Sequence, residues 1–186
     1  EDSDYRDLLG MLSRGKRDAD VVIWAYCLMP NHVHYIVVPQ GEKGLARLFG
    51  GVHRRYAQQV NRREGWRGHL WQERFFSVPM DEAHLISAVR YVELNPVRAG
   101  LCEGPADWPW SSVHAHLNRT DDDLVTVAPM LERVADWEQY LAENDSIEDL
   151  AAIRRHTCTG RPLGSDSFVI QLESITGRRL RKCRPG

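Results

Sequence analysis

The stretch that decides the fold is VVIWAYCLMPNHVHYIVVP, residues 21–39. Its first half, Val21–Met29, is rich in β-branched and aromatic residues and ends at Pro30-Asn31, a dipeptide that is typical of turns. Its second half, His32–Val38, is again β-rich and ends at Pro39. Two such runs on either side of a turn predict an antiparallel β-hairpin.

Helical patterns surround this hairpin. Apolar residues at helical spacing predict helices over residues 4–17, 44–63, 129–156 and 166–176. A further helix is expected from Asp81 to about Asn95, where Pro96 should end it. Residues 70–79 are short and aromatic-rich and are expected to be extended. The pattern therefore predicts one antiparallel hairpin among several helices.

Length and composition limit the possible protein classes. The 186 residues, 42% hydrophobic and 27% charged, are enough for one ordinary domain with a small appendage. The run Asp121–Asp123 suggests a linker or a surface loop, and we expect a first domain over residues 1–120 and an appendage over 121–186. The longest apolar run is far shorter than the ~20 residues that cross a membrane. Four scattered cysteines without a CxxC pair fit a reducing cytoplasm.

The net charge of −2 conceals a strong segregation of charge along the chain. Residues 1–41 carry −2, residues 42–80 carry +5, residues 81–150 carry −11 and residues 151–186 carry +6. Phosphate groups respond to local positive potential rather than to the total charge. The two basic stretches are therefore candidates for nucleic-acid contact, although solvated helix faces would give the same pattern.

The first chemical signal is the sequence His32-Val33-His34. Residues i and i+2 of a strand face the same side, so the two imidazoles would stand together with an apolar residue behind them. Such a pair can bind a divalent metal ion. A pair of surface histidines is the alternative, but the strongly apolar flanks favour a functional site.

The second signal is Tyr91-Val92-Glu93-Leu94-Asn95, before the proline. Positions i and i+4 of a helix share a face, so Tyr91 and Asn95 would project together. A phenol is a poor nucleophile unless a metal ion polarises its target, and an amide oxygen is a suitable ligand for Mg²⁺ or Mn²⁺. The alternative is a core tyrosine followed by a helix-capping asparagine.

Together, the hairpin with MPNHVH and the helix with YVELNPVRAGL resemble the single-tyrosine HUH transposases. The similarity is closest to the REP-associated tyrosine transposases of the insertion-sequence transposase family. Further matches are GHLWQERF at residues 68–75 and DWPWSS at residues 107–112. The resemblance covers roughly residues 4–116 and continues weakly through GRPLGS at residues 160–165.

This resemblance implies an α+β fold, an antiparallel sheet flanked by helices of the ferredoxin-like HUH nuclease type with a C-terminal helical extension. It also implies a chemistry. His32, His34 and Asn95 would bind Mg²⁺ or Mn²⁺, and Tyr91 would attack DNA to form a 5′-phosphotyrosine link and a free 3′-hydroxyl. The enzyme would cut and rejoin single-stranded or hairpin DNA in transposition, without ATP, as a monomer or homodimer. The family's sheet usually has a strand ahead of the first helix. The sequence starts at about that helix, so we expect this strand to be missing and the catalytic domain, residues 1–120, to be N-terminally incomplete.

A single-stranded DNA binder needs cations for phosphates and aromatic faces for bases. At least one of the aromatic residues near Trp71 is expected to be core instead. The candidate contacts are Arg54, Arg55, Arg62, Arg63, Arg67, Trp71 and Arg74. The C-terminal helices and basic tail form a possible DNA-binding appendage.

Two other functions compete with the transposase. One is a non-catalytic or domesticated protein that binds hairpin DNA without cutting it. The other is a hydrolase that uses the two histidines and an activated water, which the tyrosine one turn before Asn95 disfavours. A covalent protein–DNA adduct distinguishes the three.

Overall fold

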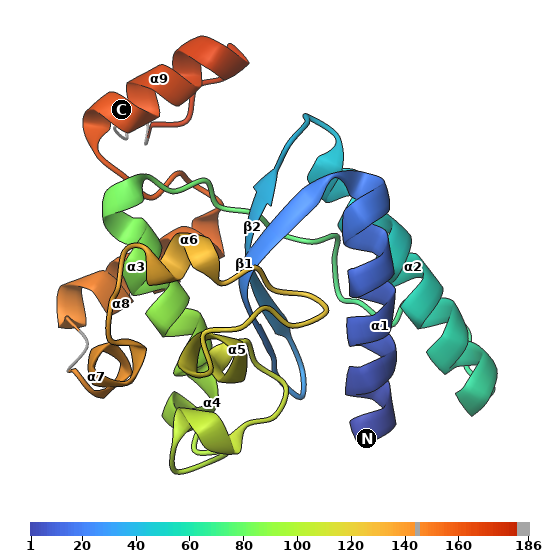
Figure 1. Cartoon of the computed structure of the whole chain (residues 1–186). Coiled ribbons are helices and arrows are strands. Elements are labelled where there is room, and N and C mark those ends of the chain that lie inside the picture. The colour runs from blue at the N-terminus through green and yellow to red at the C-terminus, as the bar shows by residue number, and fades with distance from the viewer. Residues whose placement is uncertain (144–145, 182–186) are drawn as a thin grey trace. The chain divides into compact units, whose positions relative to one another are not determined.

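The computed structural model describes residues 1–143 and 146–181 (Figure 1). The chain divides into two compact units. Unit 1 comprises residues 1–75 and 92–141, and unit 2 comprises residues 76–91 and 142–186. Each unit is therefore built from two separate stretches of sequence.

Unit 1 contains the hairpin and most of the helices. Its elements are α1 Asp2–Ala19, β1 Val21–Leu28, β2 Val33–Pro39, α2 Gly44–Glu64, α4 Asn95–Arg98, η1 Pro105–Asp107, α5 Val113–Leu117 and α6 Ala128–Leu131, together with most of α7 Trp137–Ala142. Unit 2 contains most of α3 Glu82–Glu93, and α8 Ile147–Thr159 and α9 Asp166–Thr176. The predicted α+β class, with a small antiparallel sheet and helices, is confirmed.

The two strands pair antiparallel, and Cys27 lies opposite His34. A register shift between Ile23 and Ala25 marks a bulge at Trp24. Buried residues fill β1 almost throughout, which is why its sequence is a continuous apolar run rather than an alternating one. Within the described residues this hairpin is the whole sheet.

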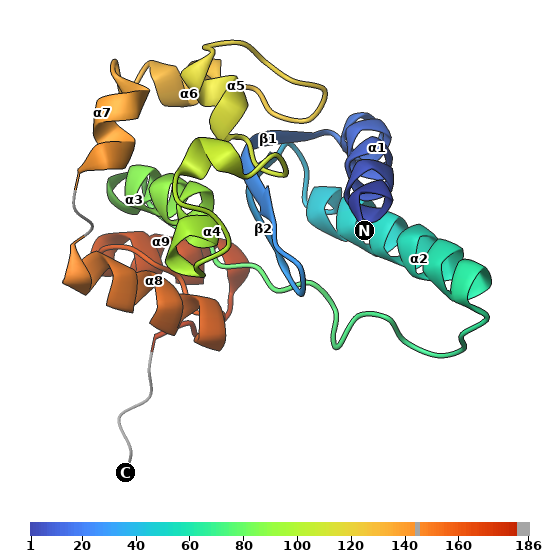
Figure 2. The same cartoon turned by 90° about the horizontal axis from the view of Figure 1, so that it is seen from below.

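Helices α1 and α2 lie side by side next to the hairpin (Figures 1 and 2). The shared core includes Leu12 of α1, Ile23 of β1, and Leu48 and Val52 of α2, none more than 1% exposed. A Cβ at Gly15 would lie 3.0 Å from Leu48 Cδ1, so the glycine lets α1 approach α2 closely. The helix pair α1 and α2 therefore covers one face of the hairpin and not the other.

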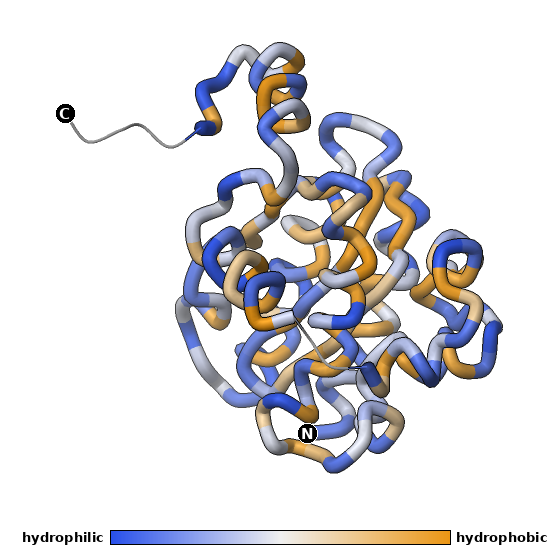
Figure 3. The backbone as a smooth tube through the Cα atoms, turned by 90° about the vertical axis from the view of Figure 1, so that its left-hand side faces the viewer, coloured by the Kyte–Doolittle hydropathy of each residue, from blue (hydrophilic) through white to orange (hydrophobic). Residues whose placement is uncertain are grey.

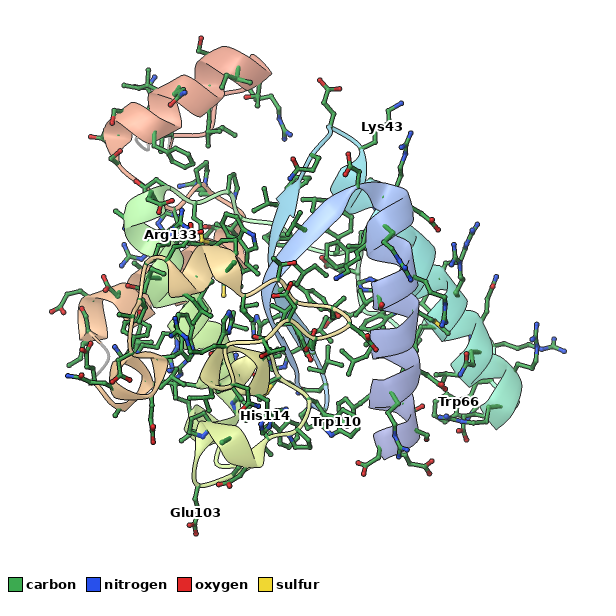
Figure 4. All side chains as sticks on the ribbon, in the orientation of Figure 1. Lys43, Trp66, Glu103, Trp110, His114 and Arg133 are labelled. Atoms are coloured by element: carbon green, nitrogen blue, oxygen red, sulfur yellow. The ribbon has the colours of Figure 1, made fainter. Side chains whose placement is uncertain are left out.

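The segment after α4 bonds the free edge of β1. Leu28 N–H donates to the Trp110 carbonyl at 2.8 Å, and Thr126 N–H donates to the Ile23 carbonyl at 2.9 Å. Trp110, which is labelled in Figure 4, also stacks on Tyr5 of α1 at 4.8 Å between ring centroids. The DWPWSS segment is therefore part of the core of unit 1.

Of the two interpretations of the aspartate run, a linker or a surface loop, residues 121–127 fit the surface loop. Asp122 accepts hydrogen bonds from Leu124 N–H at 2.6 Å and Tyr26 Oη at 2.8 Å, and Leu124 and Val125 are buried. The acidic side chains close a turn that anchors this segment in unit 1. Unit 1 consequently extends past the boundary expected at residue 120, as far as residue 141.

Unit 2 is organised around the loop between α8 and α9. Asp81 accepts from Ser165 N–H at 2.8 Å, and Leu163 pairs with Met80 in an isolated parallel bridge. A Cβ on Gly164 would lie 2.8 Å from the Asp81 carboxyl oxygen, so a larger residue there would displace this contact. Along α9, hydrophobic and hydrophilic residues alternate around the helix (Figure 3), and Ile170 on it is half exposed.

Three predicted elements differ from the structure. Helix α3 ends at Glu93 rather than near Asn95, and Pro96 lies in the first turn of the short helix α4. Residues 70–79 form bends and coil instead of a strand. The helical stretch 129–156 is divided among α6, α7 and α8. Among the described residues, no helix is long and apolar enough to cross a membrane.

Candidate functional site

The two histidines stand together at the turn end of the hairpin. His32 directly precedes β2, and its carbonyl accepts from Met29 N–H at 2.9 Å, so the hairpin geometry extends to it. Val33 packs against the core cluster, and His32 and His34 therefore project from the opposite face. Their ring centroids lie 4.8 Å apart, nearly perpendicular at 86°.

The lowered pKa values of His32 and His34 favour neutral imidazoles at pH 7. Burial lowers the pKa of His34 to about 4, and the positive charges of His32 and Arg98 add to this effect. Burial also lowers the pKa of His32. His32 Nδ1 lies 2.6 Å from Asn31 Oδ1, an acceptor, so Nδ1 carries the proton and Nε2 retains its lone pair. A neutral imidazole oriented in this way is a metal ligand.

Asn95 opens α4 and is not the C-cap of α3. Its side-chain nitrogen is buried and has no hydrogen-bond partner among the described residues. No hydrogen bond therefore explains the burial of the amide nitrogen, and it is the amide oxygen of the same group that could bind a metal ion. Two neutral imidazoles with one amide group form a donor set that fits Mn²⁺ or Mg²⁺. Within the described residues, no cluster of three or more His, Cys, Asp or Glu side chains offers a competing metal site.

Tyr91 lies on α3, half buried, four residues before Asn95. The turn at Leu94 interrupts the helix between them, so the two residues do not share one regular helix face. Tyr91 is the last residue of the first stretch of unit 2, whereas His32, His34 and Asn95 belong to unit 1. The structure thus brings the two histidines together within unit 1, and Tyr91 belongs to unit 2.

Arg98 is a neighbour of the histidines that the sequence motifs did not single out. It ends α4, three residues after Asn95, and its charge contributes to lowering the pKa of His34. The same charge also acts on the Cys27 thiol, which lies opposite His34 in the hairpin. Helix α4 therefore contributes a cation to the histidine end of the hairpin. The position of Arg98 within NPVRAGL, residues 95–101, three residues after Asn95, is the feature of the sequence that could have pointed to it.

The basic residues predicted to contact DNA differ in how free their charges are. Arg54, Arg55 and Arg62 are exposed on α2, and Arg67 and Arg74 are exposed in the segment that follows it. Arg63 is exposed as well, but its guanidinium pairs with Asp4 and Glu64, each at 2.6 Å. Exposed Lys43 and Arg47 continue this basic surface toward the start of α2, where Lys43 points outward (Figure 4).

The aromatic residues near α2 divide into packed and exposed ones. Trp71 stacks on His53 at 4.3 Å, and its indole N–H donates to the His53 carbonyl at 3.0 Å. Trp71 and Phe75 both pack against the core cluster, as expected for at least one of these aromatics. Trp66 is 59% exposed beyond the end of α2 (Figure 4). The sequence alone could not separate Trp66 from Trp71.

Comparisons with known proteins agree with the motifs. A family model described as transposase IS200 like matches residues 1–95. The REP-associated tyrosine transposase of Escherichia coli is 24% identical over 116 residues, which cover 62% of this chain and 68% of that protein. A Haemophilus influenzae protein named for the same class is 28% identical over 101 residues, 48% of this chain and 57% of that protein.

A solved structure is also similar. It is described as a REP-associated tyrosine transposase bound to a REP hairpin, and it matches with a TM-score of 0.51 and 28% identity over 63% of this chain and 69% of that one. The matched region spans a little over half of the Haemophilus influenzae relative. The family model covers just over half of the 186 residues, and the chain therefore belongs to the family of IS200-like transposases.

Proposed function

We propose that this chain is a metal-dependent tyrosine transposase that nicks and rejoins single-stranded or hairpin DNA. The observation that carries the proposal is the pair of neutral histidines, 4.8 Å apart, on the strand end of a member of the IS200-like family. The similar structure, described as bound to a REP hairpin, supports hairpin DNA as the substrate class.

The proposed metal ligands are His32, His34 and Asn95, with Mg²⁺ or Mn²⁺ as the ion. When bound, the ion would stabilise negative charge on the phosphate that is attacked. The histidines meet this role because their lowered pKa values leave both rings unprotonated at neutral pH. Arg98 adds a fixed positive charge beside His34 that can attract the DNA phosphate.

Tyr91 is the proposed nucleophile. Its hydroxyl oxygen forms a bond to phosphorus as the bond from phosphorus to the 3′ oxygen breaks. The phenolic proton leaves, the 3′ oxygen takes up a proton, and the products are a 5′-phosphotyrosine and a free 3′-hydroxyl. The number of phosphoester bonds is conserved, so attack by a 3′-hydroxyl on the phosphotyrosine reverses the step without ATP.

DNA would approach the exposed basic surface of α2. Arg54, Arg55, Arg62, Arg67 and Arg74 can each reach a phosphate because they are exposed. Arg63 can contribute only by exchanging its carboxylate partners for a phosphate. Trp71 is only partly exposed, so exposed Trp66 offers the larger stacking face for a base.

The C-terminal region is a second proposed DNA contact. Exposed Arg154 and Arg155 on α8, Arg161 in the loop and Arg178 after α9 give this part of unit 2 a positive surface. The residues beyond Arg181 in the basic tail lie outside the described residues. A binding role for this appendage depends on charge alone and is secondary to the α2 surface.

The decisive test is a denaturing gel of labelled hairpin DNA incubated with the protein and Mn²⁺. Wild type should give a protein–DNA adduct that survives denaturation. Tyr91→Phe keeps the ring but lacks the attacking oxygen, so adduct and nick should both disappear while hairpin binding persists. Tyr5→Phe is the matched control, because this half-buried ring packs on Trp110 in unit 1 and its hydroxyl has no proposed role.

Each competing function predicts a different combination of DNA binding, nicking and covalent adduct. Binding without adduct or nick in wild type indicates a hairpin-binding protein that does not cut. Nicks without adduct indicate a hydrolase that uses water at the histidine site. An adduct that persists in Tyr91→Phe shows that another residue attacks.

A further inference from the structure

A buried polar cluster lies in unit 1 at the end of α3. It consists of Glu93, Ser112, His116 and Trp137; the first three are 0% exposed and Trp137 is 3% exposed. Glu93 ends α3, Ser112 precedes α5, His116 lies on α5, and Trp137 begins α7. We call this group the Glu93 cluster.

Glu93 accepts a hydrogen bond from each of the other three side chains. Its Oε1 accepts from Ser112 Oγ at 2.6 Å and from His116 Nδ1 at 2.6 Å, and its Oε2 accepts from Trp137 Nε1 at 2.8 Å. The His116 ring also stacks on Trp137 at 4.4 Å between centroids. Both carboxyl oxygens are satisfied, and the acceptor role of Glu93 determines that His116 carries its proton on Nδ1.

A fully buried carboxyl group is costly to desolvate, and apolar residues of similar size would fill the same space. The three hydrogen bonds to Glu93 fix one arrangement of the elements they join, because any shift leaves a buried carboxyl oxygen without its partner, whereas His116 Nε2 is buried with no partner among the described residues. The Glu93 cluster therefore holds in register the end of α3, the start of α5 and the start of α7.

One side of the cluster is bonded to β1. Ser112 Oγ accepts from Tyr26 N–H at 3.0 Å, and Ser112 N–H donates to the Tyr26 carbonyl, also at 3.0 Å. Tyr26 immediately precedes Cys27, the cross-strand partner of His34. The cluster is thus connected by hydrogen bonds to the backbone of the hairpin one residue from the position opposite His34.

The other side of the cluster leads directly to Asn95. Leu94 follows Glu93 as a turn, and α4 begins at Asn95. The Leu94 carbonyl accepts from Arg98 N–H at 3.0 Å, so the first turn of α4 is joined to the residue next to Glu93. Because α3 ends at Glu93 and α4 begins at Asn95, the regular geometry of α3 does not by itself position α4.

We propose that Glu93 is a positioning residue that holds Asn95 in register with His32 and His34, so that the three side chains can close on one divalent ion. The inference rests on the proposed function, because it takes Asn95 as the third ligand. A metal ion requires its ligands within about 0.5 Å of their bound positions, which makes backbone register at Asn95 decisive. Loss of outer supporting bonds typically weakens metal binding by roughly 10–100-fold.

The test measures Mn²⁺ binding directly, by titration calorimetry on the full chain without DNA. Glu93→Gln replaces one acceptor oxygen by an NH₂ group that faces donors, and it should weaken Mn²⁺ binding by about tenfold. Asn95→Ala should weaken binding by removing the ligand itself. The double variant should bind Mn²⁺ no more weakly than Asn95→Ala alone, because without the ligand there is nothing to position.

Two controls separate positioning from general damage. Glu103→Gln makes the same charge change at an exposed side chain that points outward (Figure 4), and it should leave Mn²⁺ affinity unchanged. Hairpin DNA binding in EDTA should be the same for wild type and Glu93→Gln. If Glu93→Gln does not fold, Trp137→Phe replaces it, because this change removes the donor to Glu93 Oε2 and keeps an aromatic ring against His116.

The outcomes distinguish this inference from the proposed function. Unchanged Mn²⁺ affinity in a folded Glu93→Gln protein, with weakened binding in Asn95→Ala, overturns only the positioning role. The positioning role is also overturned if the double variant loses Mn²⁺ affinity by the product of the losses that the two single substitutions cause. Unchanged affinity in Asn95→Ala overturns the ligand assignment and the positioning role together. A wild-type protein that binds Mn²⁺ through Asn95 but forms no Tyr91 adduct leaves the positioning role standing and overturns the nucleophile.

Discussion

The histidine end of the hairpin and the outer face of α2 both belong to unit 1, yet they are built in opposite ways. His34 is half buried with a strongly lowered pKa, and Cys27 opposite it is buried within β1. Arg54 and Arg55 are exposed, and among the described residues no ion pair involves either of them. Metal chemistry needs a few groups in fixed positions, whereas phosphate binding adds many small and adjustable contributions.

The contrast predicts that one substitution at the histidine end removes function whereas one on α2 does not. His34→Ala deletes a proposed ligand, so nicking of hairpin DNA with Mn²⁺ should fall by more than the roughly 100-fold that loss of an outer-shell partner costs. Hairpin binding in EDTA should stay within about twofold, because arginine–phosphate contacts do not involve the ion. Gel-shift and nicking assays on the same preparation measure both.

His69→Ala is the matched control, because this histidine is exposed and lies outside the hairpin. It should nick like wild type. Full nicking by His34→Ala would refute the metal assignment, and loss of EDTA-resistant binding in that variant would mean that the two regions are not separate in function.

The difference between these regions also explains what the sequence could predict. The hairpin was predictable because turn residues separate two long β-rich runs, and α9 matched residues 166–176 because its periodicity and its Ser165 cap are local. The pairing of His32 with His34 followed from strand geometry alone.

Features that depend on tertiary packing were not predictable. The Glu93 cluster joins side chains 19, 23 and 44 residues apart in sequence, and none of its members carries a local signal. The exposure of Trp66 and the packing of Trp71 depend on which ring meets His53. Asp122 looked like part of a solvated linker or surface loop, because its bond to Tyr26 is invisible in the sequence.

A second prediction concerns the stability of the metal-free protein at low pH. The pKa of His34 is about 4 in the folded chain and has a reference value of 6.5. Between these values the unfolded chain takes up a proton that the folded chain does not, so the free energy of unfolding decreases as pH falls from 6.5 toward 4. The loss from this group is about 3 kcal/mol.

Urea unfolding in EDTA at several pH values measures this decrease, and His34→Gln is the comparison. The variant lacks the titrating ring, so its stability should fall less over the same range. If the free energy of unfolding depends on pH identically in wild type and His34→Gln, then His34 is not a buried histidine with a lowered pKa, and the contrast with the exposed face of α2 fails. No comparable effect is expected for exposed arginines, which stay charged throughout.

The smallest expected effect is on the outer face of α2. Neutralising Arg54 and Arg55 together, as Arg54→Gln with Arg55→Gln, should lower hairpin affinity about tenfold near ~0.1 M salt. It should also flatten the slope of log affinity against log salt by about 2, since each phosphate contact to duplex DNA contributes about 0.9.

The control is Arg14→Gln with Arg17→Gln on α1, the same charge change at two other exposed positions. This control should leave the slope unchanged. Equal flattening in both pairs would mean that DNA responds to total charge and that α2 is not a defined surface. An unchanged slope in the α2 pair would transfer the phosphate contacts to the basic C-terminal region of unit 2. In each case nicking per bound complex should stay near the wild-type rate, because the histidine end of the hairpin is untouched.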